Sequence, residues 1–266
     1  MAPVALTIAG SDSGGGAGIQ ADIKTFTSLG VFGTSALTAI TAQNTVGVPG
    51  IHVLEPSFVT AQIDAVATDF SLSAAKTGML ANADIIHAVA QAIRQHSIPK
   101  LVIDPVMVSK TRVSLLEPQA KEALVKQLFP LATVVTPNIP EAEEITGFRI
   151  VAPADMRRAA MQIKDLGPQW VVVKGGHMEG EAIDLAYNGE EFIEISSRRY
   201  QTKNTHGTGC TFSAAITAYL ALGATVVDAL LKAKEFITWA IANSLSLGHG
   251  HGPVNHFYYR RPTNSV

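Results

Sequence analysis

The chain has 266 residues, of which 47% are hydrophobic and only 16% charged, so it can bury a large core and lacks the composition of a disordered protein. Its net charge of −2 offers no basic surface to nucleic acid or to an acidic membrane, which leaves small molecules as the expected partners. Because it has one cysteine, no basic leader and no long unbroken apolar segment, we expect a cytoplasmic protein without an internal disulfide or a membrane span.

The first predicted elements are a strand at residues 4–9, a glycine-rich loop at 10–18 and a helix at 19–29. Within them, residues 16–21 match the pattern G-x-G-x-x-A of a dinucleotide-binding fingerprint. That site also needs an acidic residue, or an arginine for a 2′-phosphate, about 20 residues further on. No Asp, Glu or Arg occurs between Ile23 and Leu54. We therefore expect the loop to be a flexible cover over a substrate.

Alternating strands and helices follow. A second strand at 35–42 ends at Gln43 and is followed by a loop that contains Gly47, Pro49 and Gly50. The next predicted elements are a helix at 56–68, a strand at 74–80 leading to a helix capped by Asn82, a strand at 101–103 closed by Asp104, a helix at 117–128, a strand at 133–136, a helix at 153–166 and a strand at 170–174.

The C-terminal third begins with a predicted hairpin. Two short apolar runs between residues 183 and 197 flank Asn188-Gly189, which is a strong hairpin signal. Two long helices at 208–222 and 226–247 and an irregular tail at 248–257 complete the chain. Since no repeat, linker or change in composition marks a boundary, we expect one domain over residues 1–266.

This order of elements predicts an α/β fold of three layers, with a mostly parallel central sheet that helices cover on both faces. Ligands of such sheets bind beyond the carboxyl ends of the strands. The polar residues that directly follow predicted strands should therefore gather at one edge; they are Gln43, Asn44, Lys76, Thr77, Asp104, Asn138, Glu141 and Lys174.

An anion site is predicted at residues 204–210, where glycines and small hydroxyl residues open a long apolar helix. Backbone N–H groups at such a helix start are unpaired and carry its positive partial charge. Cys210, the only cysteine, lies there too, where a thiolate would be stabilised. The alternative is a glycine-rich turn that binds nothing. The dipeptide Gly-Lys of a Walker A loop does not occur, so any use of ATP must fall outside the P-loop class.

Asp104, Asn138 and Glu141 could together hold Mg²⁺, which prefers oxygen ligands and is often bound by substrate phosphates as well. Alternatively, Asn138 and Glu141 only cap the helix that follows Pro140. Lys174 at the end of a buried strand would be costly unless it met an anion. The histidines of the tail could bind an adventitious metal, but a role in lining the turn is the favoured interpretation.

Taken together, the motifs resemble the hydroxymethylpyrimidine/phosphomethylpyrimidine kinases of thiamine biosynthesis, which belong to the ribokinase-like superfamily. The resemblance spans essentially the whole chain, in order. The segments that carry it are 9–22, 42–45, 76–80, 104–108, 136–142, 173–177, 204–210 and 248–257.

The resemblance implies transfer of the γ-phosphoryl group of ATP to the hydroxymethyl oxygen of 4-amino-5-hydroxymethyl-2-methylpyrimidine and then to the resulting monophosphate. Gln43 would meet the aminopyrimidine edge, because one amide both donates and accepts. The other substrate-binding positions implied are Gly10, Asp22, Met79 and Val106. ATP would be bound by Lys174, Thr208 and Asn138, Mg²⁺ by Asp104 and Glu141, and the transferred phosphoryl group by Gly207, Thr208, Gly209 and Cys210.

Cys210 stands where sugar kinases of the superfamily carry a catalytic aspartate. A thiol is a poor base unless the helix start lowers its pKa, so we expect the anion site to contribute more than the base. Residues 111–114 depart from the usual pattern, which leaves loop closure and the second phosphorylation open.

A pyridoxine- or pyridoxal-type vitamin kinase is the nearest alternative, and Gln43 favours the pyrimidine. From other classes, a noncatalytic binding protein or an oxidoreductase remains possible. The resemblance also implies a homodimer.

Overall fold

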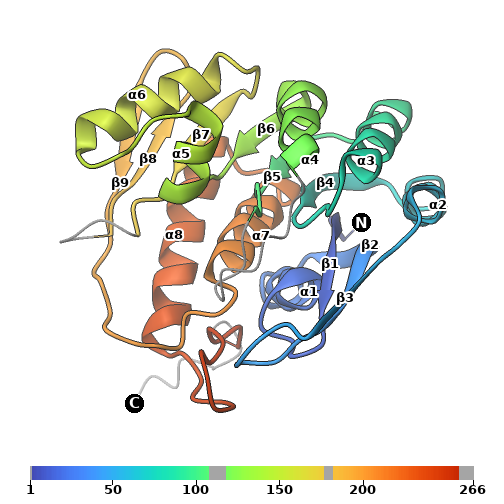
Figure 1. Ribbon diagram of the computed structural model, residues 1–266, viewed down its shortest axis with the longest axis horizontal. Coiled ribbons are helices and arrows are strands. Elements are labelled where there is room, and N and C mark those ends of the chain that lie inside the picture. The colour runs from blue at the N-terminus through green and yellow to red at the C-terminus, as the bar shows by residue number, and fades with distance from the viewer. Residues whose placement is uncertain (1, 108–117, 177–181, 258–266) are drawn as a thin grey trace.

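The computed structural model describes residues 2–107, 118–176 and 182–257. In these ranges one nine-stranded sheet runs through the molecule in the order β3-β2-β1-β4-β5-β6-β7-β8-β9 (Figure 1). The strands from β2 to β7 in this order are parallel, whereas β3, β8 and β9 pair antiparallel at the two edges. The strands are β1 (Val4–Asp12), β2 (Phe32–Ala42), β3 (Gly50–Val53), β4 (Leu72–Thr77), β5 (Leu101–Ile103), β6 (Ala132–Val135), β7 (Trp170–Val173), β8 (Asp184–Tyr187) and β9 (Phe192–Ile195).

Helices cover both faces of this sheet, which confirms the predicted three layers. The helices are α1 (Gly18–Ser28), α2 (Pro56–Ala67), α3 (Ala83–Gln95), α4 (Pro118–Ala123), α5 (Ile139–Thr146), α6 (Pro153–Lys164), α7 (Thr208–Ala221) and α8 (Val226–Ala242). On β5, Leu101 and Ile103 face the core shared with α2 to α6, and Val102 faces the core beneath α7 and α8. Because both faces are buried, the central strands are continuous apolar runs rather than alternating ones.

Two local predictions are confirmed, the cap of α3 and the hairpin between β8 and β9. Asn82 caps α3 by accepting a hydrogen bond from the backbone N–H of Ile85 at 2.9 Å. The Asn188-Gly189 hairpin joins β8 and β9, with Gly189 at a φ of 105°. No helix in the described ranges is long and apolar enough to cross a membrane.

Other elements differ from the prediction. β3 was not predicted, because it has four residues, three of them exposed, and its apolar signal is short. The helix expected at 117–128 is α4 followed by a π-helical turn at Leu124–Leu128. Its first predicted residue and the unusual segment 111–114 lie outside the described residues. The last helix ends at Ala242 instead of residue 247, because the backbone N–H of Leu245 bonds to Pro253 of the tail.

The tail folds back onto the loop that follows β2. The carbonyl oxygen of Thr45 accepts from the N–H of His251 at 3.0 Å, and its hydroxyl accepts from the N–H groups of His249 and Gly250. A Cβ at Gly250 would lie 1.9 Å from the Thr45 carbonyl oxygen, so only glycine allows this approach. The contact brings two segments that lie far apart in the sequence to one rim of the cavity described below.

Candidate active site

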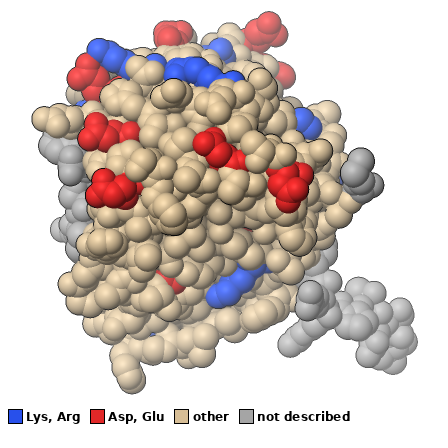
Figure 2. Space-filling model, turned by 90° about the vertical axis from the view of Figure 1, so that its right-hand side faces the viewer, with Lys and Arg blue, Asp and Glu red and all other residues tan. Residues whose placement is uncertain are grey.

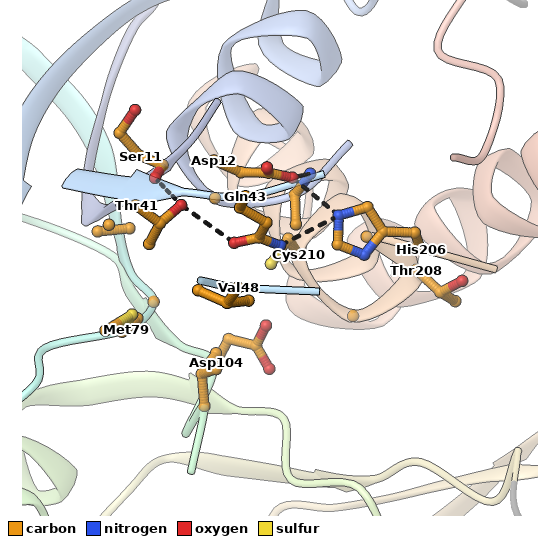
Figure 3. A pocket seen from close by; sticks show the side chains of 18 of the residues that line it. Ser11, Asp12, Thr41, Gln43, Val48, Met79, Asp104, His206, Thr208 and Cys210 are labelled. Carbon is orange, nitrogen blue, oxygen red and sulfur yellow. Dashed lines mark hydrogen bonds and ion pairs between the residues drawn. The ribbon is translucent and has the colours of Figure 1, made fainter. Parts of the chain in front are cut away.

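A single cavity at the carboxyl ends of the parallel strands brings together all the predicted site residues except Asp22. It extends to the start of α7 and to the tail, where His251 lines it. Figure 3 shows part of it, with Gln43, Met79 and Asp104 from three strand ends. The predicted residues that line it are Gly10, Gln43, Met79, Asp104, Val106, Asn138, Glu141, Lys174, Gly207, Thr208, Gly209 and Cys210.

Asp22 does not line this cavity, contrary to the direct substrate contact that we expected. It is fully buried in α1, and its two carboxylate oxygens each lie 2.9 Å from Nζ of Lys76. Thr7 donates a third hydrogen bond to it at 2.7 Å. Burial lowers the pKa of Lys76, but the charge and hydrogen bond of Asp22, together with the charges of Cys210 and Asp104, raise it by more, so the ammonium form is retained. Asp22 thus holds Lys76, which does line the cavity and to which the sequence assigned only a place at the sheet edge.

The end of the cavity beyond β5 and β7 holds an ion pair. Nζ of Lys174 lies 2.9 Å from Oδ1 of Asp104, and the hydroxyl of Ser213 donates to Oδ2 of Asp104 at 3.3 Å. Burial lowers the pKa of Lys174, but Asp104 and Glu141 raise it by more. The strand-end lysine therefore meets an anion, as the sequence required, and that anion is a neighbouring side chain.

Asn138 and Glu141 form a capping box at the start of α5. The backbone N–H of Asn138 donates to Glu141 Oε2 at 2.8 Å, and the backbone N–H of Glu141 donates to Asn138 Oδ1 at 2.9 Å. The capping alternative is thus confirmed, yet both residues also line the cavity. Burial and the charge of Asp104 raise the pKa of Glu141, and the charge of Lys174 offsets only part of this rise. The resulting pKa is about 7.

Magnesium fits this end of the cavity only as an ion that substrate also binds. Asp104 and Glu141 supply carboxylate oxygens there, and Mg²⁺ commonly uses one or two such ligands with water and phosphates. In the described ranges no group of three His, Cys, Asp or Glu side chains could hold a metal without such help. The tail histidines accordingly form no metal cluster: His256 bonds to Thr211 at 2.9 Å, and His251 to the carbonyl of Lys203.

The predicted anion loop opens α7 and faces this ion pair. Gly207 has a φ of 77°, and a Cβ there would lie 1.7 Å from the carbonyl oxygen of Gly16, so glycine is required twice over. A Cβ at Gly209 would lie 3.4 Å from Nζ of Lys174 and 3.6 Å from Oδ2 of Asp104. The N-terminus of a 14-residue helix, a lysine and a carboxylate thus meet at one point.

Cys210 does not have the stabilised thiolate that its position predicted. Burial raises the pKa of its thiol to about 11, and the positive charge of Lys76 offsets only part of this rise. Asp104 and Asp22 add negative charge that raises it further. The sequence showed the helix start but not the buried carboxylates beneath it. As the site stands, Cys210 is a thiol at neutral pH.

The glycine-rich loop after β1 is held by hydrogen bonds in this structure, and its flexibility as a cover stays a prediction. The carboxylate of Asp12 accepts from the backbone N–H groups of Gly14, Gly16 and Ala17 at 2.8, 3.1 and 2.8 Å. His206 adds a fourth contact at 2.8 Å. Sequence reasoning missed this cluster, although an aspartate two residues before a glycine is a known turn signal. No local signal could have found His206.

The amide of Gln43 and several apolar side chains also line the cavity. Gly10, Met79, Val48 and Val106 line it, and a Cβ at Gly10 would lie 3.2 Å from Sδ of Met79. A flat ring would thus find apolar walls and the amide of Gln43, with the polar side chains of Thr41 and His206 beside that amide. This is the usual composition of a site for a small heterocycle.

Comparisons with known proteins identify the family of the chain. The family model for phosphomethylpyrimidine kinase matches residues 12–255. The hydroxymethylpyrimidine/phosphomethylpyrimidine kinase of Bacillus subtilis is 49% identical over 97% of this chain and 96% of its own length. The ADP complex of Bacillus subtilis pyridoxal kinase has a TM-score of 0.90 at 44% identity, covering 96% of this chain and 98% of that one. Phosphomethylpyrimidine kinase from Clostridium difficile 630 has a TM-score of 0.80 at 47% identity, covering 90% and 99%. The chain has the ribokinase-like fold and belongs to the phosphomethylpyrimidine kinase family.

Proposed function

We propose that this kinase transfers the γ-phosphoryl group of ATP to the hydroxymethyl oxygen of 4-amino-5-hydroxymethyl-2-methylpyrimidine, and then phosphorylates the monophosphate, in thiamine biosynthesis. One observation carries the proposal. A single cavity is lined by the amide of Gln43, by apolar side chains such as Met79 and Val48, and by the anion loop with Lys174 and Asp104. A ring and a phosphate chain can therefore be bound in the same cavity.

Catalysis at this site would rest on positioning and charge rather than on a strong base. Phosphoryl transfer needs its attacking and leaving oxygens held in line and its negative charge stabilised. The backbone N–H groups at the start of α7 and the ammonium of Lys174 supply fixed positive charge where the phosphoryl group would pass. Cys210, with a pKa of about 11, is poorly suited to remove a proton at neutral pH.

Asp104 and Glu141 would hold the Mg²⁺ that accompanies ATP, which neutralises charge on its phosphates. Asp104 is 2% exposed and bound to Lys174, so binding the ion means exchanging one cationic partner for another. In the capping box Asn138 accepts through Oδ1, so its amide nitrogen can still donate. We therefore assign Asn138 both to holding Glu141 in place and, with Lys174 and Thr208, to binding ATP.

Pyridoxal phosphorylation is the second candidate. It is favoured by the close structural similarity to Bacillus subtilis pyridoxal kinase, at a TM-score of 0.90. Gln43 favours the pyrimidine, because an amide can pair with an amino group and the ring nitrogen beside it. Pyridoxal has no amino group next to its ring nitrogen.

Mass spectrometry of the products tests the proposal. Incubation of hydroxymethylpyrimidine with ATP and Mg²⁺ should yield a product heavier by one phosphoryl group and then one heavier by two. A reaction with pyridoxal alone would establish the second candidate instead.

We further propose that the chain acts as a single domain and as a homodimer in the cytoplasm. Large apolar side chains are exposed on β2, β3 and around α2, namely Phe32, Ile40, Ile51, Val53, Phe58 and Phe70. The side of the molecule that carries these elements has a wide area with few charged residues (Figure 2). Light scattering of the purified protein tests the dimer, since a monomer mass at micromolar concentration would exclude it.

A further inference from the structure

The side chain of Gln43 lies in a chain of polar contacts that runs from Ser11 to Asp12 (Figure 3). Oγ1 of Thr41 lies 2.8 Å from the carbonyl oxygen of Ser11 and 3.1 Å from Oε1 of Gln43. On the other side, Nε2 of Gln43 lies 3.4 Å from Nε2 of His206, which lies 2.8 Å from Oδ2 of Asp12. The hydrogens along this chain must be distributed so that every donor meets an acceptor.

Asp12 determines where His206 carries its hydrogen. Burial raises the pKa of Asp12, but the hydrogen bond and charge of His206 and the backbone N–H groups of Ala17 and Gly14 lower it by more, so this carboxyl is ionised at neutral pH. An ionised carboxylate can only accept hydrogen bonds. Nε2 of His206 must therefore bear a hydrogen and donate it to Asp12.

This excludes a hydrogen bond from the amide nitrogen of Gln43 to His206. An amide nitrogen only donates, so two donors would face each other across the 3.4 Å between Nε2 of Gln43 and Nε2 of His206. The other end of the amide is also mismatched. Thr41 has one hydroxyl hydrogen, and the nearer carbonyl of Ser11 takes it, which leaves a lone pair facing Oε1 of Gln43.

Rotation of the amide by 180° removes both conflicts without moving any other atom. Its nitrogen then donates to the free lone pair of Thr41, and its oxygen lies 3.4 Å from Nε2 of His206, where it can share the N–H hydrogen that His206 donates to Asp12 at 2.8 Å. Oxygen and nitrogen of an amide are nearly alike in shape, so the hydrogen-bond network decides between the two orientations. The backbone of Gln43 is held too, because the hydroxyl of Ser13 accepts from its N–H and donates to its C=O, both at 2.7 Å.

We propose that Thr41 and His206 are positioning residues that hold the amide oxygen of Gln43 toward His206 and its nitrogen toward Thr41, and so determine substrate specificity. An amide that cannot rotate presents its oxygen, an acceptor, and its nitrogen, a donor, to the substrate at fixed positions. A ring with an amino group beside a ring nitrogen can match these positions, and a ring without the amino group leaves the amide oxygen unpaired, which is a large penalty in a closed site. The inference rests on the proposed function, because it takes Gln43 as the group that meets the aminopyrimidine.

Nuclear Overhauser contacts in the free protein test the orientation without any substrate. The side-chain NH₂ protons of Gln43, assigned by their loss in Gln43→Met, should show contacts to the methyl group of Thr41. Contacts to the carbon-bound ring protons of His206 instead would overturn the inference. This result stands even if the protein does not phosphorylate the pyrimidine, in which case only the proposed function fails.

Kinetics test the positioning role. His206→Leu should raise KM for hydroxymethylpyrimidine about tenfold, the effect of one lost hydrogen bond, and leave KM for ATP within about twofold. His206→Gln, whose amide can place an N–H near the same point, should restore most of the affinity. Thr41→Val should act like His206→Leu, with Thr41→Ser as its control. Equal losses in His206→Gln and His206→Leu, or a parallel rise in KM for ATP, would overturn the assignment.

Discussion

The ammonium of Lys174 and the carboxylate of Asp104 form an ion pair, with 2.9 Å between Nζ and Oδ1, beside Gly209 at the start of α7. From the sequence we predicted different partners for these two residues, ATP phosphate for Lys174 and Mg²⁺ for Asp104. Their pairing means that each neutralises the other before substrate binds. On the proposed function, binding of ATP with Mg²⁺ would be an exchange of partners that leaves neither charge uncompensated.

Removal of Lys174 should therefore affect ATP far more than the pyrimidine. Lys174→Met leaves Asp104 without its cation and the phosphates without theirs, so we expect KM for ATP to rise at least about tenfold with KM for the pyrimidine nearly unchanged. Lys121→Met is the matched control, since Lys121 pairs with Glu144 on the surface. Steady-state kinetics with each substrate varied in turn provide the measurement. Equal increases in both KM values would argue against a phosphate role for Lys174.

Substitution of the two glycines of the anion loop by alanine should have different effects on stability and turnover. Gly207→Ala places a Cβ 1.7 Å from the carbonyl oxygen of Gly16 at a φ of 77°, so it should lower thermal stability as well as turnover. Gly209→Ala meets no atom closer than 3.4 Å and lies within α7, so stability should hold or rise slightly. Its methyl group nevertheless takes up space between the loop and the ion pair. We expect turnover to fall about a hundredfold or more, as for the loss of a group that stabilises the transition state.

Melting curves and kcat for both variants test this contrast. Normal turnover of Gly209→Ala would show that the anion loop does not take part in the reaction.

Cys210 should react as a buried thiol. With a pKa of about 11, its alkylation rate by iodoacetamide should rise about tenfold for each pH unit from 8 to 10, because only the thiolate reacts. Glutathione is the control, with a thiol that ionises near the usual value of about 8.5 and a rate that levels off above pH 9. A plateau for Cys210 below pH 9 would mean that the helix start does stabilise the thiolate.

Cys210→Ser should keep measurable turnover if the loop matters more than the base. Serine fills nearly the same volume and leaves the backbone N–H groups of α7 in place. Activity at the level of the uncatalysed reaction would instead assign proton transfer to the thiol. The assay must be run beside Gly209→Ala, so that the loss of the base and the loss of the anion site are compared directly.

Asp22 should prove structural. Asp22→Leu leaves the fully buried ammonium of Lys76 without its counter-ion, which costs about 3–5 kcal/mol of unfolding free energy. The double variant Asp22→Leu/Lys76→Met removes both charges and should recover most of that stability. Urea unfolding followed by circular dichroism measures both. If Asp22→Leu kept full stability and lost only substrate affinity, the result would instead support the direct substrate contact predicted from the sequence.

The strands and most helices could be predicted because their signals are local. Apolar runs closed by Asp104, Asn138 and Lys174 indicate strand ends, and parallel strands bring such ends to one edge of a sheet. The pairings at that edge could not be predicted. Asp12 and His206 are 194 positions apart, and nothing near either residue indicates the other. For the same reason the pKa of Cys210 was misjudged, since the carboxylates that raise it come from distant elements.

The ratio of kcat/KM for hydroxymethylpyrimidine to that for pyridoxal, measured by ADP release under identical conditions, tests the central claim most directly. Gln43 and the residues that hold it predict a ratio well above one for the wild-type enzyme, falling toward one in Gln43→Met. ADP release with pyridoxal alone, or a ratio that Gln43→Met leaves unchanged, would contradict the account.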